Sequence, residues 1–122
     1  KMDDKTKIEA CIQLYFDSLY ESDTDKVRAS FHDAAMVSGY LPDGLHEMNR
    51  SEFADFVGSQ QPSPKENNDD ILLEIISCEI NGLTASAKVR DGYLGMVFLD
   101  TLSFLKVDDE WKIYNKLFHV ES

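Results

Sequence analysis

The sequence predicts an α+β fold in which three N-terminal helices pack on a mostly antiparallel sheet. Two observations support this prediction. Between Ile8 and Leu19 the apolar residues recur every three or four positions, which is the spacing of an amphipathic helix. Between Met96 and Leu105 successive side chains form two distinct sets, with the period of two that marks a β-strand. A length of 122 residues predicts a single domain, residues 1–122, with its own core.

The composition limits the partners that the chain can have. Its 23 acidic and 12 basic residues give a formal net charge of −11, which repels phosphate backbones and anionic membrane surfaces. We therefore expect neither nucleic acid nor a membrane as a partner. Cys11 and Cys78 have no CxxC spacing, so no disulfide framework or thiolate metal site is expected. With no apolar stretch long enough to span a bilayer, the chain is expected to be soluble and cytoplasmic.

The first helix is predicted from one stripe of apolar side chains. The members of this stripe are Ile8, Cys11, Ile12, Tyr15, Phe16 and Leu19. Tyr15 has two interpretations: its hydroxyl reaches a cavity, or the residue is a core aromatic with its hydroxyl at the edge.

A second helix and a small hairpin follow. Ser22 and Asp25 have the spacing of a capping box, which predicts a short helix that ends near His32. At the negative end of that helix, a cationic His32 would act as a cap. Strands are then expected at 34–40 and 45–48, because a Pro-Asp-Gly turn separates two apolar runs.

The third helix begins with another capping-box spacing, between Asn49 and Glu52. Gly58 suits the left-handed residue that follows a helix end. Segment 59–70 has two prolines and no large apolar residue, so it is predicted to be a long surface loop, either mobile or functional as a lid. The buried face of the third helix is expected to consist of Phe53, Phe56 and Val57.

The second half of the chain is predicted to be a series of hairpins. Asn81-Gly82 is expected to form a type I′ turn, since both residues tolerate positive φ angles. Asp91-Gly92 should begin the connection to the next hairpin. The predicted core face of the first hairpin consists of Ile76, Cys78, Ile80, Leu83, Ala85, Ala87 and Val89.

The long hairpin of Gly95–His119, with its turn at Asp108-Asp109, is the centre of the prediction. A loop of two or four residues pairs Leu102 with Asn115, Asp100 with Leu117 and Phe98 with His119. The inner face then consists of Phe98, Asp100, Leu102, Phe104, Trp111, Ile113, Asn115, Leu117 and His119. Burying polar groups on such an apolar surface costs free energy unless they find partners, so this face predicts the wall of a pocket.

Asp100 is the candidate general base, because a carboxylate on an apolar face has its pKa raised by desolvation. His119 or Asn115 would orient it or polarise a substrate carbonyl. The alternative is a buried polar network, in which Asp100 bonds Asn115 or a backbone group without any catalytic role. The candidate ligand-binding residues are Tyr15, Phe98, Leu102, Asn115 and Trp111, of which Trp111 also suits a core anchor.

No metal site or cofactor is expected. The three histidines, His32, His46 and His119, have neither HxH nor HxxxH spacing. No Gly-rich phosphate loop, nucleophile elbow or redox CxxC motif occurs. Arg90 is expected to form a surface ion pair, or else to bind a ligand anion.

Four stretches of the sequence resemble a known family. They are YFDSLYESDTDKVRASFHDAA (Tyr15 to Ala35), RSEFADFV (Arg50 to Val57), AKVR (Ala87 to Arg90) and FLDTLSFLKVDDEWKIYNKLFH (Phe98 to His119). The chain resembles the nuclear transport factor 2-like superfamily, which includes SnoaL-like proteins, and within it the small bacterial family of putative lumazine-binding proteins. The Asp-Gly turn that is usual in that family is replaced here by Asp108-Asp109.

This resemblance implies a cone-shaped domain in which a curved sheet wraps around the first helix and leaves a conical cavity. It also implies a homodimer formed through the outer face of the sheet. On the predicted register that face consists of Leu99, Leu105, Tyr114, Phe118 and Val120 with Thr101, Ser103, Lys112 and Lys116. The superfamily contains ketosteroid isomerase-like enzymes, SnoaL-like polyketide cyclases, dehydratases and binding domains, so the fold alone does not define a reaction.

Two functions therefore remain open at the level of sequence, beside the third alternative of a purely structural dimer. The first is a small-molecule binding or accessory domain whose apolar pocket holds a small apolar or aromatic ligand. The second is an isomerase, dehydratase or cyclase that uses Asp100 as its general base. Binding is favoured, because the sequence offers one plausible base but no second committed acid.

Overall fold

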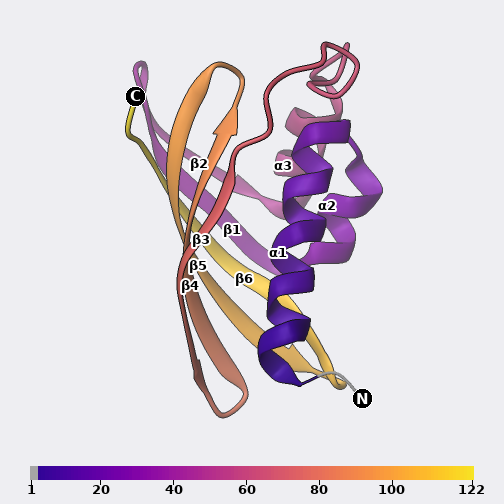
Figure 1. The fold of residues 1–122 in the computed structure, drawn as a ribbon, viewed down its shortest axis with the longest axis vertical. Helices are drawn as coiled ribbons and strands as arrows, with labels where there is room; N and C mark the ends of the chain where they lie inside the picture. Colours follow the sequence, from indigo (N-terminus) through magenta and orange to yellow (C-terminus); the bar gives the residue numbers. More distant parts are fainter. Residues whose placement is uncertain (1–2) are drawn as a thin grey trace.

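The computed structural model describes residues 3–122, which form three helices and one six-stranded sheet. The strands lie in the order β2-β1-β6-β5-β4-β3, and every neighbouring pair is antiparallel except β1 with β6. The sheet curves, and all three helices cover its concave face (Figure 1). The helices are α1 (Asp4–Glu21), α2 (Thr24–Ser30) and α3 (Arg50–Gly58). The strands are β1 (Phe31–Leu41), β2 (Gly44–Asn49), β3 (Leu73–Asn81), β4 (Thr84–Tyr93), β5 (Met96–Val107) and β6 (Glu110–Val120).

Helix α1 buries the stripe that its periodicity predicts. Ile8, Ile12 and Tyr15 have no exposed surface, because the apolar side of the helix lies against the sheet. Asp3 caps the N-terminus by accepting a hydrogen bond from the Thr6 amide, 2.8 Å. No helix within residues 3–122 combines the length and the apolar character needed to cross a bilayer.

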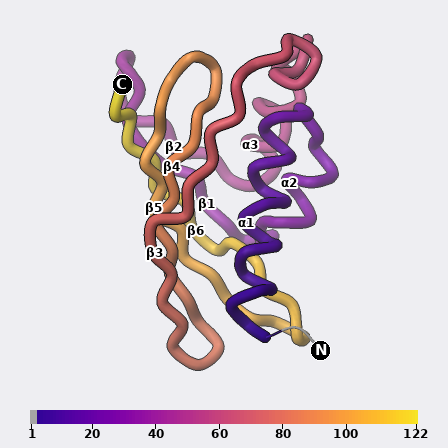
Figure 2. The backbone as a smooth tube through the Cα atoms, viewed as in Figure 1, coloured from indigo at the N-terminus to yellow at the C-terminus, as the bar shows by residue number. Residues whose placement is uncertain are grey.

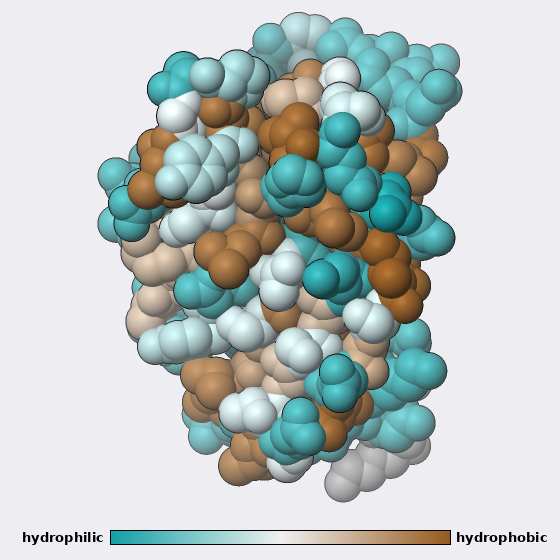
Figure 3. Space-filling model, turned by 90° about the vertical axis from the view of Figure 1, so that its left-hand side faces the viewer, coloured by the Kyte–Doolittle hydropathy of each residue, from teal (hydrophilic) through white to brown (hydrophobic). Residues whose placement is uncertain are grey.

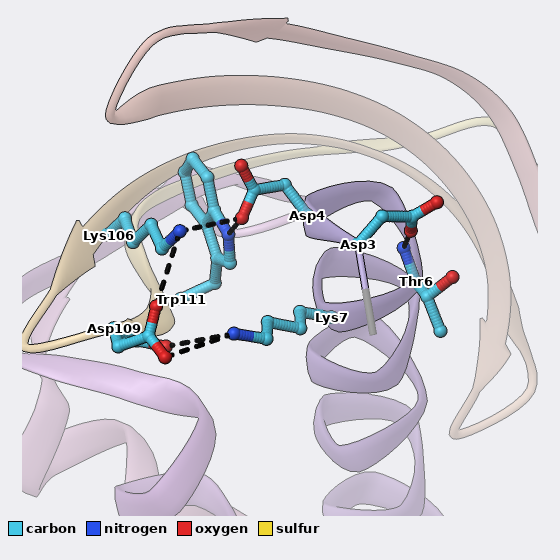
Figure 4. A network of polar contacts seen from close by, with 7 residues as sticks. All are labelled: Asp3, Asp4, Thr6, Lys7, Lys106, Asp109 and Trp111. Atoms are coloured by element: carbon cyan, nitrogen blue, oxygen red, sulfur yellow. Dashed lines mark hydrogen bonds and ion pairs between the residues drawn. The ribbon is translucent and has the colours of Figure 1, made fainter. Parts of the chain in front are cut away.

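Polar contacts attach the start of α1 to the β5–β6 turn (Figure 4). Asp4 Oδ1 accepts hydrogen bonds from Lys106 Nζ at 2.9 Å and from Trp111 Nε1 at 3.0 Å. Lys7 Nζ lies 3.3 Å from Asp109 Oδ2. These links hold the N-terminal end of α1 against the β5–β6 turn. The C-terminal end of the helix, at Leu19, borders a cavity.

The second helix is shorter than predicted. Its N-cap is Asp23, which accepts from the Lys26 amide, rather than Ser22. The helix ends at Ser30 and the strand begins immediately at Phe31. His32 therefore lies in β1, where its Nδ1 accepts from the amide of Ala34. The prediction that His32 caps the helix is wrong, because the buried Phe31 already belongs to the sheet.

The capping box of α3 is confirmed, since the side chain of Asn49 accepts from the Glu52 amide and the side chain of Glu52 accepts from the Asn49 amide. Gly58 is not the left-handed residue that was predicted; it is the last residue of the helix. A Cβ at Gly58 would lie 2.5 Å from Cγ2 of Thr24. The glycine is therefore required for the close approach of α3 to α2.

Segment 59–72 arches over the end of α1 before it enters β3, as the tube in Figure 2 shows. The Ser22 hydroxyl donates to the carbonyl of Gln60 at 2.6 Å, and the Lys65 amide donates to the carbonyl of Tyr20 at 2.9 Å. The predicted loop is thus tied to the C-terminal end of the first helix.

Two of the predicted hairpin turns are displaced along the chain. The β3–β4 turn is Gly82-Leu83, because Asn81 pairs with Thr84, and only Gly82 has a positive φ, as in a type II′ turn. The turn is displaced by one residue, which moves the partner of Cys78 by two residues, from Ala85 to Ala87, so Cys78 still shares a face with Ala87. The next turn is Leu94-Gly95, where both φ angles are positive, and not Asp91-Gly92, which remain inside β4.

The β5–β6 hairpin has the predicted two-residue turn but not the predicted register. Asp108 and Asp109 adopt φ angles of 51° and 65°, which suit a type I′ turn, and Val107 pairs with Glu110. The register then shifts between Phe104 and Ser103, because Tyr114 is an extra residue in β6. This irregularity is a β-bulge, and it reverses the faces of every later residue of β6.

The bulge corrects the predicted inner face. Beyond it Leu102 pairs with Lys116, Asp100 with Phe118 and Phe98 with Val120. Lys116 and Phe118 therefore point toward the helices, whereas Asn115, Leu117 and His119 pair with Ser103, Thr101 and Leu99 on the outer face. The prediction that Asn115 and His119 share a wall with Asp100 is wrong. Arg90 forms the expected surface ion pairs, with Glu74 and Glu121.

Candidate functional site

A cluster of polar side chains is buried between α1 and the sheet. The Tyr15 hydroxyl donates to Oδ2 of Asp100 at 2.6 Å and lies 3.2 Å from Oδ2 of Asp91. Asp91 and Asp100 are 1% and 0% exposed. Three elements position these groups, since Tyr15 comes from α1, Asp91 from β4 and Asp100 from β5. Two carboxyl groups therefore share one hydroxyl donor inside the core.

The two carboxyl groups meet because of the β4–β5 register. Val89 pairs with Asp100, and Asp91 pairs with Phe98. Asp91 and Asp100 are thus diagonal neighbours on one face of the sheet, a separation across which side chains still interact. That face is the one covered by the helices, so both carboxyl groups point into the protein.

Lys116 supplies the positive charge of the cluster. Its Nζ lies 4.0 Å from Oδ2 of Asp100, and its side chain is 8% exposed. The ammonium also lies over three aromatic rings, 4.7 Å from the centroid of Tyr15, 4.8 Å from Phe53 and 5.8 Å from Phe118. Cation–π attraction from these rings holds the ammonium at this position.

Burial and mutual charge set the protonation of the cluster. Desolvation, and after it the negative charge of Asp100, raises the pKa of Asp91 to about 8, although Lys116 opposes the shift. Burial also raises the pKa of Tyr15 well above its ordinary value, with a further contribution from both carboxyl groups. Near neutral pH Asp91 is therefore protonated. The carboxylate of Asp100 then balances the charge of the Lys116 ammonium.

Part of the hydrogen-bonding capacity of this cluster is unused. Among residues 3–122, the side-chain atoms Asp91 Oδ1, Asp100 Oδ1 and Tyr93 Oη are buried without a partner. An unpaired polar atom in the core costs about 1–3 kcal/mol. The cluster therefore retains unsatisfied groups in the region where β4 and β5 border a cavity.

The cavity has a volume of about 160 Å³ and lies between α3, β1, β2 and the β4–β5 turn. Asp91 and Lys116 line it from the side of the polar cluster, and His46 lines it from β2. The remaining wall is apolar and includes Leu41, Met48, Phe53, Met96, Phe98 and Phe118. An apolar cavity with a few convergent polar groups is the usual form of a small-molecule site.

A second hollow, of about 360 Å³, lies between α1, segment 59–72 and the β4–β5 turn. It shares Leu19, Tyr93, Leu94 and Met96 with the wall of the first cavity. Asp69 and Asp70 lie on its rim and are exposed. This hollow lacks a cation such as Lys116, so the first cavity is the better candidate for a functional site.

The structure brings together only some of the predicted site residues. Tyr15 and Asp100 contact each other but lie behind the cavity wall, as does the fully buried Leu102. Phe98 lines the cavity. Trp111 lies elsewhere, near the β5–β6 turn, where it donates to Asp4.

Two residues of the site, Asp91 and Lys116, are not among the site residues predicted from the sequence. Asp91 could have been found, since the alternation of Ala85, Ala87 and Val89 continues to it and places it on the core face. The glycine that follows it, Gly92, instead predicts a turn at this position. Lys116 could not be found in this way, because the bulge that turns it inward leaves no periodic signal.

The arrangement of a curved sheet, three covering helices and a cavity between them defines the nuclear transport factor 2-like fold. Solved structures confirm this class. A nuclear transport factor 2-like protein of unknown function from Methylobacillus flagellatus KT has a TM-score of 0.86 at 26% identity, covering 100% of this chain and 95% of that chain. A similar protein from Silicibacter pomeroyi DSS-3 has a TM-score of 0.85 at 20% identity, covering 95% and 94%.

A third structure, from Shewanella baltica OS155, is also described as a nuclear transport factor 2-like protein of unknown function, with a TM-score of 0.80 at 22% identity over 100% of this chain and 99% of that one. Residues 3–119 match the family described as putative lumazine-binding. The chain belongs to that family, as the resemblance of its sequence predicts. No curated protein matches it.

Proposed function

We propose that this chain binds a small, largely apolar molecule in the cavity lined by Asp91 and Lys116. One observation carries the proposal: an apolar cavity of about 160 Å³ is bordered at one side by a cation and a protonated carboxyl group. A cavity of about 150 Å³ is enough for a benzene ring. The family description, putative lumazine-binding, also favours a small ligand.

A cavity-filling substitution tests binding directly. Leu41→Trp should fill the cavity from β1, because Leu41 is part of its wall. Leu45→Trp is the matched control, since Leu45 lies nearby on β2 and is 53% exposed outside the cavity. A fragment library screened by NMR against the ¹⁵N-labelled protein should give hits that Leu41→Trp abolishes and Leu45→Trp retains. Hits that survive in both variants would show that the ligand binds elsewhere.

The second candidate function is proton transfer, as in an isomerase, dehydratase or cyclase. One observation favours it: the pKa of Asp91 is raised to about 8 at the cavity wall, near the value that suits a general base. Asp100, the base that the sequence suggested, lies behind that wall and would assist through Tyr15. In such an enzyme Asp91→Asn should lower turnover by orders of magnitude with little change in affinity, whereas a binder should show only a modest change in affinity.

We propose further that two copies associate through the outer face of the sheet. On this face apolar and polar residues are interspersed (Figure 3). Leu117 is 54% exposed, Tyr114 41% and Tyr40 69%, and such a surface is suited to self-association about a two-fold axis. The bulge changes which residues of β6 lie on this outer face. Leu117 and His119 lie there, in place of the predicted Phe118 and Val120.

Sedimentation velocity at micromolar concentration tests the dimer. The wild type should sediment as a dimer, and Leu117→Glu should sediment as the 13.9 kDa monomer. Lys5→Glu, an exposed change on α1 and therefore on the opposite side of the sheet, serves as the control and should remain dimeric. A wild-type monomer at these concentrations would contradict the proposal.

We also propose a cytoplasmic location. Cys11 and Cys78 are both free thiols, and burial raises the pKa of Cys11 to about 11, which keeps that thiol protonated and unreactive. Unpaired cysteines are typical of reducing compartments. Fractionation of cells that express the full-length protein would test the location.

A further inference from the structure

The ammonium of Lys116 has no hydrogen-bond acceptor within the part of the chain described, residues 3–122. The nearest carboxylate oxygen, Oδ2 of Asp100, is 4.0 Å away, which is beyond hydrogen-bonding distance. The three N–H groups of an ammonium ordinarily find acceptors when the residue is buried. The rings of Tyr15, Phe53 and Phe118 attract the charge, but they supply no oxygen acceptor.

The Lys116 side chain lines the cavity, whereas its counter-ion does not. Asp100 is fully buried behind the cavity wall, where it accepts from Tyr15. Lys116 therefore borders the cavity, and Asp100 lies on the other side of the wall. On the same wall Asp91 is protonated near neutral pH, so it presents no negative charge to an occupant.

We infer that the cavity takes a monocyclic aromatic carboxylate, whose carboxylate group accepts hydrogen bonds from Lys116 while its ring lies among the phenylalanine side chains. This inference rests on the proposed binding function and specifies the chemical class of its ligand. An anionic oxygen at Lys116 would satisfy the unused N–H donors by charge-assisted hydrogen bonds, which are about twice as strong as neutral ones.

The size and lining of the cavity favour a single ring. About 160 Å³ of space accommodates one six-membered ring, with the carboxylate directed to the polar end. Phe53, Phe98 and Phe118 line the cavity, and their faces and edges suit offset or edge-to-face contacts with an aromatic ligand. A cationic ligand is disfavoured, since it would meet Lys116 at the polar end.

The alternative is that Lys116 serves only to balance the charge of Asp100. The two roles predict different ligand selectivity. A purely structural Lys116 would leave the cavity indifferent between a carboxylate and its neutral amide. A ligand-binding Lys116 would select the carboxylate.

Benzoate, benzamide and toluene separate these roles, because they share a ring and differ in charge and polarity. Each is titrated by NMR into the ¹⁵N-labelled wild type, into Lys116→Met and into the control Lys88→Met, a lysine exposed on β4. We expect wild type and Lys88→Met to bind benzoate at least tenfold more tightly than benzamide. Lys116→Met should lose this preference and retain affinity for toluene within threefold.

Each outcome decides a separate question. Equal affinity for benzoate and benzamide, or a preference that survives in Lys116→Met, would overturn the inference and leave the proposed binding function intact. If none of the three compounds perturbs the resonances of the cavity, the inference fails, and the fragment screen with Leu41→Trp decides the proposed binding function separately.

A second measurement uses the wild type alone, in case Lys116→Met does not fold. Benzoate affinity should fall several-fold between pH 7 and pH 9 as Asp91 ionises beside the bound carboxylate, whereas toluene affinity should change by less than twofold. The charged or titratable groups around Asp91 are Tyr15, Tyr93, His46, Asp100 and Lys116. Repeating the titration with His46→Gln separates the contribution of that residue, and a constant benzoate affinity in both proteins would overturn the inference.

Discussion

Asp91 should make the stability of the fold strongly dependent on pH, and Asp91→Asn should remove that dependence. Burial and the charge of Asp100 raise the pKa of Asp91 from 3.8 to about 8 in the folded chain. In the unfolded chain the carboxyl returns to its ordinary pKa. Between about pH 4 and pH 8 the folded state therefore binds one more proton than the unfolded state. Linkage requires the free energy of unfolding to fall as the pH rises through this window.

The magnitude follows from the size of the shift. A change from 3.8 to about 8, at about 1.4 kcal/mol for each pH unit, gives an upper limit of about 6 kcal/mol. We expect a measured loss on the order of 3–6 kcal/mol, because local rearrangement around an ionised Asp91 would relieve part of the cost. Asparagine matches the shape of the protonated carboxyl and is neutral at every pH. The variant should therefore lie within about 2 kcal/mol of the wild type at pH 5, where the wild type has lost only the first part of this stability, and exceed it by several kcal/mol at pH 9.

Urea denaturation followed by circular dichroism at pH 5, 7 and 9 measures these differences. The control is Asp55→Asn, an exposed position on α3, which should follow the wild-type curve. Surface carboxyl groups whose pKa is lowered by partners, such as Asp3 and Asp109, titrate below this window. A wild-type stability that is flat or rises between pH 5 and pH 9, or an Asp91→Asn variant that retains the fall, would refute the reasoning.

Three further substitutions test the surroundings of the site, each by urea denaturation at pH 7 with the slope of the transition checked against wild type. Tyr15→Phe should destabilise by about 2–3 kcal/mol, because Asp100 loses its donor at 2.6 Å; a loss below about 0.5 kcal/mol would mean that water or Lys116 replaces the hydroxyl. Asn49→Ala should cost about 1 kcal/mol through loss of the capping box, and Asn49→Ser should recover most of it. Gly39→Ala should cost about 1–3 kcal/mol, since the added Cβ would overlap the carbonyl and the ring of Phe118; an unchanged stability would mean that Phe118 moves aside.

The helices were predictable because their signals are local. The stripe around Ile8, Ile12 and Tyr15 needs only the period of an α-helix, and the capping box at Asn49 and Glu52 needs only three residues of spacing. Both features are present in the structure. The end of α2 was not predictable by such rules, since the buried Phe31 joins the sheet before the helical pattern would end.

Two of the hairpin turns, those after β3 and β4, were predictable in number but not in position, whereas the Asp108-Asp109 turn lies where it was predicted. Gly82 has a positive φ, as expected, but it takes the first central position of a type II′ turn rather than the second of a type I′ turn. Gly92 was read as a turn residue, yet it lies within β4, where its amide donates to the carbonyl of Leu72. A glycine occurs either where the backbone adopts a positive φ or where another group approaches it closely. The sequence alone does not distinguish these two situations.

The predicted inner face of the hairpin was correct for β5 and wrong for the later part of β6. Asp100 and Leu102 point inward because β5 alternates regularly through them. The prediction for Asn115 and His119 relied on an uninterrupted ladder, and one extra residue at Tyr114 was enough to reverse it. Pairing with β1 is also irregular at this point, since the partner of Ile113 is Phe31 and that of Asn115 is Met36.

The bulge at Tyr114 links the shape of the sheet to the chemistry of the cavity. Before it, Trp111 and Ile113 face the core beneath α1; after it, Lys116 and Phe118 face the cavity. A bulge bends its strand and increases the twist of the sheet, and β6 is a central strand, paired with β1 and β5. The same irregularity therefore adds to the bend of the sheet and turns the Lys116 side chain toward the cavity. A regular strand would place a neutral or exposed side chain there and leave Asp100 without its cation.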